Sequence, residues 1–123
     1  NLYDNRLFVG KKYITLKQDV NADGAFKLGL DNNAGTAMYA IDKCVFVVKY
    51  DHDINAEYDD FGCSFETYTS PEIMELETIG HVHYLEPGEV ATHVENWSLY
   101  ENIGTPDARD EEAIDKFYNN YVK

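Results

Sequence analysis

Glu66 is the residue of this sequence with the clearest potential for acid–base chemistry. It stands in the stretch GCSFETYTS (62–70), where apolar and polar residues alternate as in a half-buried strand. Successive side chains point to opposite faces, with Cys63, Phe65 and Thr67 on one and Ser64, Glu66 and Tyr68 on the other. A carboxylate on such a face can accept substrate hydroxyls or act as a general base if the face borders a site.

The turn sequence DVNADG offers a second group of oxygen donors. Asp19, Asn21 and Asp23 alternate and are followed by Gly24, like the first half of a calcium-binding loop. The twelfth position of such a loop needs a bidentate glutamate, and here it is Leu30. Strand patterns flank the turn, so we favour a simple Asn/Asp/Gly turn and keep calcium as the alternative.

His81 and His83 are two residues apart in GHVHYLEPGEVATHVEN and would point to the same side of a strand. Two such histidines can bind a transition metal, with further ligands from the same segment: Glu86, Glu89 or His93. The pattern is similar to the metal motif of cupins, but a Pro-Gly turn and the short spacing to His93 depart from it. We favour ordinary strand or turn histidines.

The remaining motifs give little support for metal or nucleophilic catalysis. The acidic loop DHDINAEYDD (51–60) has Ala56 where a calcium loop needs glycine, which favours a solvated connection. The sequence contains no G-x-S-x-G motif and no histidine adjacent to Cys44 or Cys63. We predict no cofactor.

Composition limits the classes of partner. The formal net charge of −13 repels phosphate backbones and anionic lipid surfaces, so we predict neither nucleic-acid nor membrane partners. The apolar runs are far shorter than the ~20 residues of a membrane-spanning helix. We interpret Cys44 and Cys63 as free buried thiols and keep, as the alternative, a single disulfide bridge between neighbouring strands. The compartment is not fixed by these features, with a cytoplasmic location favoured.

Short alternating segments predict an all-β fold. Ten tyrosines and six phenylalanines lie mostly in runs with a period of two, which is typical of strands with one buried face. Turn residues separate these runs at spacings that suit a sandwich or barrel. The expected strands are 12–18, 26–30, 36–41, 44–50, 63–69, 73–79 and 90–100. Residues 44–48 are continuously apolar, which predicts a central strand.

The C-terminal segment predicts a helix. Thr105 is the expected N-cap, Pro106 suits the first helical position, and acidic residues follow early in the segment. One apolar stripe at helical spacing consists of Ala113, Ile114, Phe117, Tyr118 and Tyr121. We therefore predict an antiparallel β-sandwich over residues 1–104 with a helix over 105–123 docked on it.

Three stretches carry a resemblance to a known family: FKLGL (26–30), the segment from YDDFG to EPGE (58–89), and ENWSLYE (95–101). Together they resemble the C-terminal part of a bacterial family of uncharacterised proteins in the galactose mutarotase-like (aldose epimerase-like) superfamily. The resemblance covers about residues 4–101. It implies a supersandwich of antiparallel sheets, of which this chain would be the C-terminal portion of a larger protein.

The resemblance also implies site residues. In aldose epimerases a glutamate lies on a late strand before a PGE-type turn, which places Glu66 on the position of the catalytic base. Tyr68 stands where that family commonly has glutamine. The histidine that protonates the ring oxygen in that family has no counterpart in residues 1–61. Lys27 alternates onto the side opposite Phe26, where it would share the face of Glu66.

We therefore predict a carbohydrate-binding domain with Glu66 as the catalytic-type residue and Tyr68, Lys27 and Ser64 as substrate contacts. The first alternative is an aldose 1-epimerase-like isomerase with Glu66 as base. The second is a metal-binding cupin-like barrel or a structural module without a site. Whether the chain is an enzyme, which sugar it takes and its oligomeric state stay open at this stage.

Overall fold

The computed structural model describes all residues, 1–123, as eight strands and two helices. Two of the sheets have three antiparallel strands each, and a third is a two-stranded ribbon. The strands are β1 (Leu7–Val9), β2 (Ile14–Leu16), β3 (Phe26–Leu30), β4 (Thr36–Ile41), β5 (Cys44–Tyr50), β6 (Phe65–Thr69), β7 (Met74–Thr78) and β8 (Glu95–Tyr100). The helices are α1 (Asp59–Gly62) and α2 (Glu111–Tyr121). The chain thus consists mostly of strands in antiparallel sheets with a C-terminal helix, as predicted.

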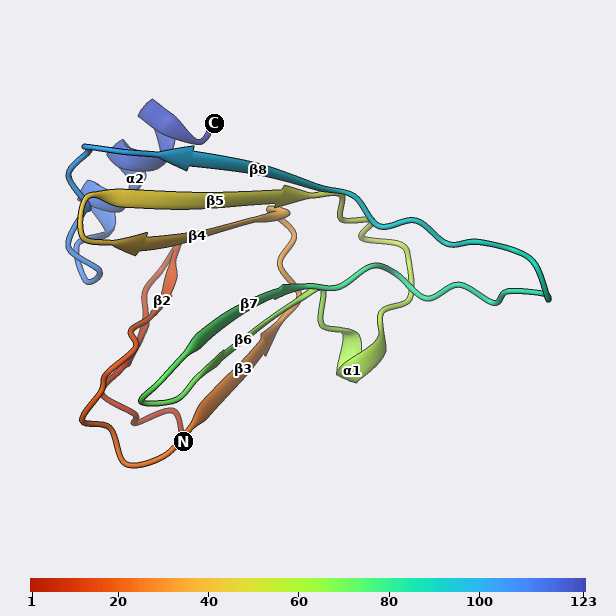
Figure 1. Cartoon of the computed structure of the whole chain (residues 1–123), viewed down its shortest axis with the longest axis horizontal. Helices are drawn as coiled ribbons and strands as arrows, with labels where there is room; N and C mark the ends of the chain where they lie inside the picture. The colour runs from red at the N-terminus through yellow and green to blue at the C-terminus, as the bar shows by residue number, and fades with distance from the viewer.

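The two three-stranded sheets have the orders β3-β6-β7 and β4-β5-β8. Figure 1 shows them close together at one end and spread apart at the other, with the β1–β2 ribbon between them on the open side. The segment between β7 and β8, residues 79–94, extends away from both sheets as a long arm. Neither helix has the length and apolar character needed to cross a lipid bilayer.

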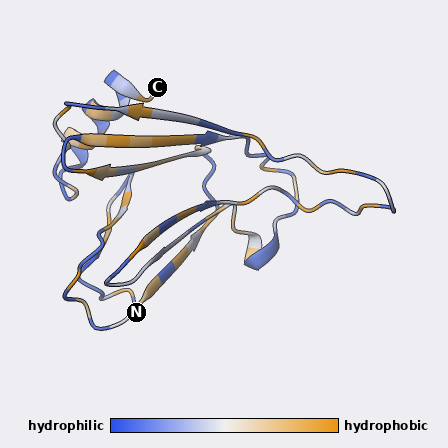
Figure 2. Cartoon of the chain, in the orientation of Figure 1, coloured by the Kyte–Doolittle hydropathy of each residue, from blue (hydrophilic) through white to orange (hydrophobic).

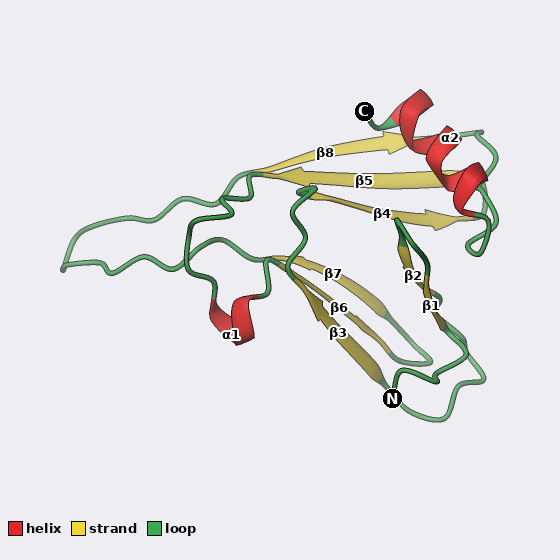
Figure 3. Cartoon of the chain, turned by 180° about the vertical axis from the view of Figure 1, so that it is seen from behind, coloured by secondary structure: helices red, strands yellow, loops and turns green.

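Strand β5 is the central strand of its sheet, as its continuous apolar sequence predicts. It is largely hydrophobic in Figure 2. Val45 and Val47 point to one face, where they form the core with Phe117 of α2 and Val122 just after it. Figure 3 shows α2 lying across this sheet near the ends of its strands. Helix α2 thus packs against this sheet through Phe117.

The start of α2 differs from the prediction. The helix begins at Glu111, and its N-cap is Asp110, whose carboxylate accepts hydrogen bonds from the backbone N–H groups of Glu112 and Ala113. This cap satisfies two of the amides that a helix start leaves free. The expected cap, Thr105, therefore lies outside the helix, in the connection that follows β8.

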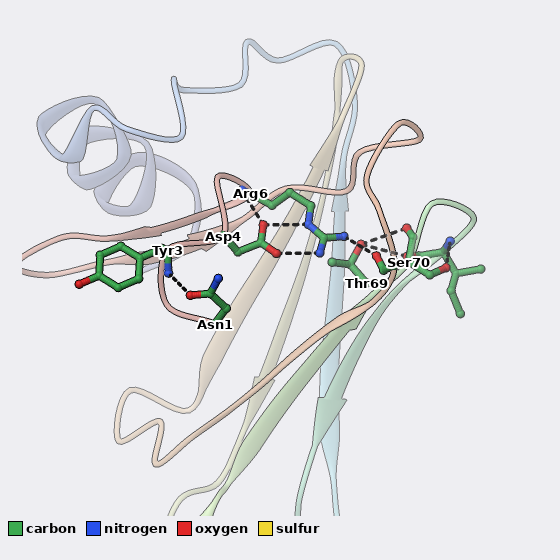
Figure 4. A network of polar contacts seen from close by, with 8 residues as sticks. Asn1, Tyr3, Asp4, Arg6, Thr69 and Ser70 are labelled. Atoms are coloured by element: carbon green, nitrogen blue, oxygen red, sulfur yellow. Dashed lines mark hydrogen bonds and ion pairs between the residues drawn. The ribbon is translucent and has the colours of Figure 1, made fainter.

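The N-terminal segment is fastened to β3 by a buried arginine. Arg6 is only 7% exposed, and its guanidinium pairs with Asp4 through a 2.8 Å contact (Figure 4). The same guanidinium donates to the carbonyl of Gly24 and lies over the ring of Phe26. The hydrogen bonds between Arg6 and Asp4 lower the pKa of Asp4 to about 2. A buried arginine paired in this way anchors β1.

Tyr13, which directly precedes β2, connects that strand to α2. It makes the stability of the fold depend on pH in the alkaline range. Its hydroxyl donates to Asp115 at 2.9 Å, and burial together with this carboxylate raises its pKa to about 12. Because the raised pKa favours the protonated phenol in the folded state, its contribution is complete below pH 10 and lost as the pH rises through 12. Ultraviolet titration should show one tyrosine ionising late, and Tyr13→Phe should remove that late step. A Tyr13 midpoint near 10 would contradict this.

The hydroxyl of Tyr50 is a buried polar group without a partner. Tyr50 is 5% exposed, and no hydrogen bond reaches its Oη. Burial raises its pKa, and the side chains of Ser64 and Asn32 oppose that rise without reaching bonding geometry. A buried hydroxyl without a partner carries a desolvation penalty of about 1–3 kcal/mol.

We therefore expect Tyr50→Phe to leave the free energy of unfolding unchanged or to raise it. The matched control is Tyr100→Phe, because the Tyr100 hydroxyl donates to the carbonyl of Tyr121 at 2.6 Å. Losing that bond should lower stability by about 1 kcal/mol. Urea unfolding of both variants checks the pair, and a destabilised Tyr50→Phe protein would show that its hydroxyl has a partner.

Candidate functional site

The candidate site lies on one face of the β3-β6-β7 sheet. Strand β6 is its middle strand, and Glu66 stands opposite Gly29 of β3 and Glu77 of β7. Directly opposed residues point to the same face, so Glu66, Gly29 and Glu77 share one face. Lys27 and Tyr68 oppose each other two positions along, on that same face. The predicted sharing of a face by Lys27 and Glu66 is confirmed.

Glu66 is held in an ion pair beneath a partly open surface. Lys27 Nζ lies 2.5 Å from Glu66 Oε2 and 3.9 Å from Glu77 Oε2. The side chain of Glu66 is 7% exposed, whereas those of Lys27 and Glu77 are 49% and 40% exposed. A buried carboxylate needs such a partner, because an unpaired charge in a protein interior is costly. Solvent and ligands therefore approach Glu66 past the side chains of Lys27 and Glu77.

Asp60 adds a second carboxyl to this pair. Its pKa is raised, first by a side-chain hydrogen bond with Glu66 and next by the charge of that carboxylate. The pKa of Lys27 is raised in turn, chiefly by its hydrogen bond to Glu66. A carboxyl that keeps its proton to higher pH beside an ionised carboxylate is the arrangement that acid–base sites use. Asp60 is therefore the member of the pair whose protonated form is favoured by its neighbour.

The turn that carries Asp60 has unusual backbone geometry. Within α1, Asp60 and Phe61 have φ values of 48° and 62°, which places two consecutive non-glycine residues in the left-handed region. Such conformations are uncommon and gather at functional turns. The turn leaves the ring of Phe61 fully exposed, next in sequence to Asp60. An exposed aromatic side chain thus follows Asp60 directly in the chain.

Cys63 and Gly29 shape the floor of the site. A Cβ atom added to Gly29 would lie 2.5 Å from Cys63 Sγ and 3.6 Å from Glu66 Oε1, so the absent side chain makes room for both groups. Burial, followed by the charges of Glu66 and Asp60, raises the pKa of the Cys63 thiol. A thiol with a raised pKa is a poor nucleophile, so Cys63 fills space here. Both Cys44 and Cys63 are free.

Gly29→Ala should lower the free energy of unfolding by about 1–3 kcal/mol, the usual cost of overpacking. Because the clash is with the sulfur, adding Cys63→Ala should recover most of the loss. Gly104→Ala is the matched control, since nothing lies within 4 Å of a Cβ at that glycine. Chemical denaturation measures all three proteins. Equal stabilities for Gly29→Ala and Gly104→Ala would contradict the described floor.

Ser64 and Tyr68, the other predicted contacts, differ in their accessibility. Ser64 is fully buried, and its Oγ accepts the backbone N–H of Asn32 at 2.8 Å, so it joins the sheet to the preceding turn. Tyr68 is partly exposed on the face of Glu66. The structure thus brings Lys27, Glu66 and Tyr68 to one face and places Ser64 in the interior.

The alternative metal-binding residues lie elsewhere. His81 and His83 are in the long arm, with ring centroids 4.0 Å apart, and His93 instead contacts Thr78 Oγ1 at 2.8 Å. Nowhere do three histidine, cysteine or acidic side chains converge in a geometry suited to a metal ion. The calcium candidates, Asp19, Asn21 and Asp23, line a surface hollow of about 460 Å³ beside Arg6.

The sequence analysis did not predict Asp60 and Phe61 as site residues. Asp60 belongs to the acidic loop 51–60, which was interpreted as a solvated connection, and Phe61 follows that loop directly. The signal was the pair of acids followed by an aromatic residue and glycine, DDFG, immediately before the strand of Glu66. A second hollow, of about 410 Å³, is lined by residues from β4, β5, β8, α2 and the adjoining loops and does not include Glu66. Comparison of the chain with protein-family models, with curated proteins and with solved structures gives no match.

Proposed function

We propose that the chain is a carbohydrate-binding domain, with the sugar held over Lys27, Glu66 and Asp60. The observation that carries the proposal is the buried Glu66 carboxylate, shared between a lysine and a second carboxyl at the edge of an exposed aromatic turn. Sugar hydroxyls are both donors and acceptors, and they bind well to such charged groups. The apolar face of a pyranose ring stacks on an aromatic side chain, and Phe61 offers one.

The resemblance to the galactose mutarotase-like superfamily favours the same ligand class. In that family the strand glutamate faces the sugar, and the β-sandwich architecture would place the open sheet face toward it. The structure adds three groups that the resemblance does not name: Asp60, Phe61 and Glu77. Tyr68 lies on the same face and is the expected flanking contact. Hexoses are therefore the first ligands to test.

Titration of the full chain with D-galactose, D-glucose and, as a ring-free control, sorbitol tests this proposal. We expect saturable binding of the hexoses by calorimetry or NMR, and weaker binding of sorbitol, which has no ring to stack on Phe61. Phe61→Ala should weaken hexose binding without loss of fold, because the ring is fully exposed. Equal, unsaturable responses to all three compounds would contradict a sugar site.

A second candidate, aldose 1-epimerase-like catalysis, is favoured by the raised pKa of Asp60 beside Glu66. Glu66 would take the proton of the anomeric hydroxyl as the bond between C1 and the ring oxygen breaks. Asp60 would give its proton to that ring oxygen, which leaves the open-chain aldehyde, and the reverse steps close the ring on either face. Asp60 would thus fill the role that a histidine has in the family.

Polarimetry of freshly dissolved α-D-galactose tests this second candidate. The protein should accelerate the approach to the equilibrium rotation, and both Glu66→Gln and Asp60→Asn should return the rate to the buffer value. A wild-type rate equal to that of buffer, with hexose binding intact, would exclude catalysis and leave the binding proposal standing.

A further inference from the structure

Strand β8 is an open edge of the β4-β5-β8 sheet. It pairs only with β5, and its residues have no other backbone hydrogen bonds. Five of its six residues are exposed, and the sixth, Tyr100, is partly exposed. In Figure 1 it forms the outer border of its sheet. Unpaired N–H and C=O groups along an edge are a template for another strand. A partner at this edge would therefore bind as an extended strand, through backbone hydrogen bonds.

The side chains beside this edge are apolar on the face opposite α2. Trp97 and Leu99 oppose Val48 and Phe46 of β5, and they are 70% and 64% exposed. The ring of Trp97 meets that of Phe46 edge-on, with centroids 5.5 Å apart. Ile41 at the end of β4 is 53% exposed. Large exposed apolar groups that gather on one sheet face are typical of interaction surfaces.

Charge distinguishes this edge from the rest of the chain. The chain carries a formal net charge of −13, which makes two copies repel each other over most of their surfaces. The only ionisable carboxylate of β8 is Glu95, and its oxygens accept hydrogen bonds from Thr78 and from the indole of Trp97. The strand also has no lysine or proline, the residues that commonly keep edges apart. A second copy therefore meets little like charge along this strand.

We propose that β8 pairs antiparallel with β8 of a second copy of this chain, so that the two sheets become one continuous sheet. A two-fold axis perpendicular to the sheet keeps the same face of both copies on one side, so odd-numbered residues oppose odd-numbered ones. Pairing centred on Trp97 places it opposite Trp97 of the second copy and sets Glu95 against Leu99. This register avoids like charges directly opposite each other.

Analytical ultracentrifugation and tryptophan fluorescence of the full chain test the proposal together. Trp97 is the sole tryptophan, so its emission reports on this edge alone. We expect a monomer–dimer equilibrium, with emission shifting to shorter wavelength over the concentration range in which the mass doubles. A monomer at all concentrations up to 1 mM, or a dimer with unchanged emission, would overturn it.

Leu99→Glu and Leu85→Glu form a matched pair for the same test. Both leucines are exposed, but Leu85 lies in the long arm between β7 and β8. A glutamate at residue 99 loses an apolar contact and sets a negative charge opposite Glu95 of the second copy, so it should weaken dimerisation at least about tenfold. Leu85→Glu should leave the equilibrium unchanged. Equal effects of the two variants, with circular dichroism confirming both folds, would contradict pairing through β8.

Discussion

Glu66→Gln is expected to weaken hexose binding strongly while leaving the chain folded. Glutamine has nearly the same shape but no charge, so it loses the ion pair with Lys27 and the charge-assisted hydrogen bonds that a sugar hydroxyl would make. Hydrogen bonds to charged groups contribute about 1.5–3 kcal/mol, which corresponds to a loss of roughly tenfold to a hundredfold in affinity. Calorimetric titration with D-galactose measures it.

Glu75→Gln is the control for this variant. Glu75 opposes Tyr68 on the same sheet face, but it is exposed and has no ion pair in the structure. Its replacement removes one negative charge from the same face, so a general electrostatic effect would alter both variants equally. We expect near wild-type affinity for Glu75→Gln, and equal losses in both would show that binding does not depend on Glu66.

The same variant has a second, independent consequence at Asp60. The hydrogen bond and charge of Glu66 are the two leading causes of the raised pKa of Asp60. In Glu66→Gln that pKa should fall back toward the ordinary value for an aspartate. An NMR titration of the Asp60 carboxyl carbon follows this change, and an unchanged midpoint would contradict the proposed carboxyl pair.

Phe117→Ala is expected to lower the free energy of unfolding by about 3–5 kcal/mol. Phe117 is 7% exposed and belongs to a core of only four buried residues, between α2 and the sheet of β5. Removing the ring leaves a cavity that Val45 and Val47, fixed on a central strand, are poorly able to fill. Because small domains are stable by only about 5–15 kcal/mol, the loss should release α2 at moderate denaturant concentrations.

Phe61→Ala is the matched control for the core variant. It removes the same ring from a fully exposed position, and phenylalanine and alanine both have to adopt the left-handed backbone of residue 61. Urea denaturation followed by circular dichroism should give a nearly wild-type midpoint for Phe61→Ala and a much lower one for Phe117→Ala. Sugar binding should show the opposite order at low denaturant, with the larger loss in Phe61→Ala.

Local patterns in the sequence were sufficient for most strands. Residues 26–30, 36–41 and 44–50 form strands with the predicted bounds, because alternation and turn residues agree there. The predicted strand 90–100 shortens to Glu95–Tyr100, because only these residues have a partner in β5. Strand β1 was missed because its three residues are too short to show a pattern.

The site was predictable only in part, because alternation along a strand assigns side chains to faces but does not show which of them are buried. Alternation placed Lys27 and Glu66 on one face, and the structure confirms their contact. Alternation says nothing of what covers a face, so neither the burial of Glu66 nor its interaction with Asp60 was predicted. The left-handed turn at Asp60 and Phe61 has no glycine or asparagine at those two positions to predict it.

Mapping of the bound hexose by NMR tests the central claim most directly. Titration of the isotopically labelled chain with D-galactose should shift, saturably and together, the resonances of Lys27, Asp60, Phe61 and Glu66. The Lys27 ammonium should respond most, because it is the half-exposed partner of the buried carboxylate. Shifts confined to the long arm or to the face of β4, β5 and β8, or no saturable shift at all, would contradict a sugar site at Glu66.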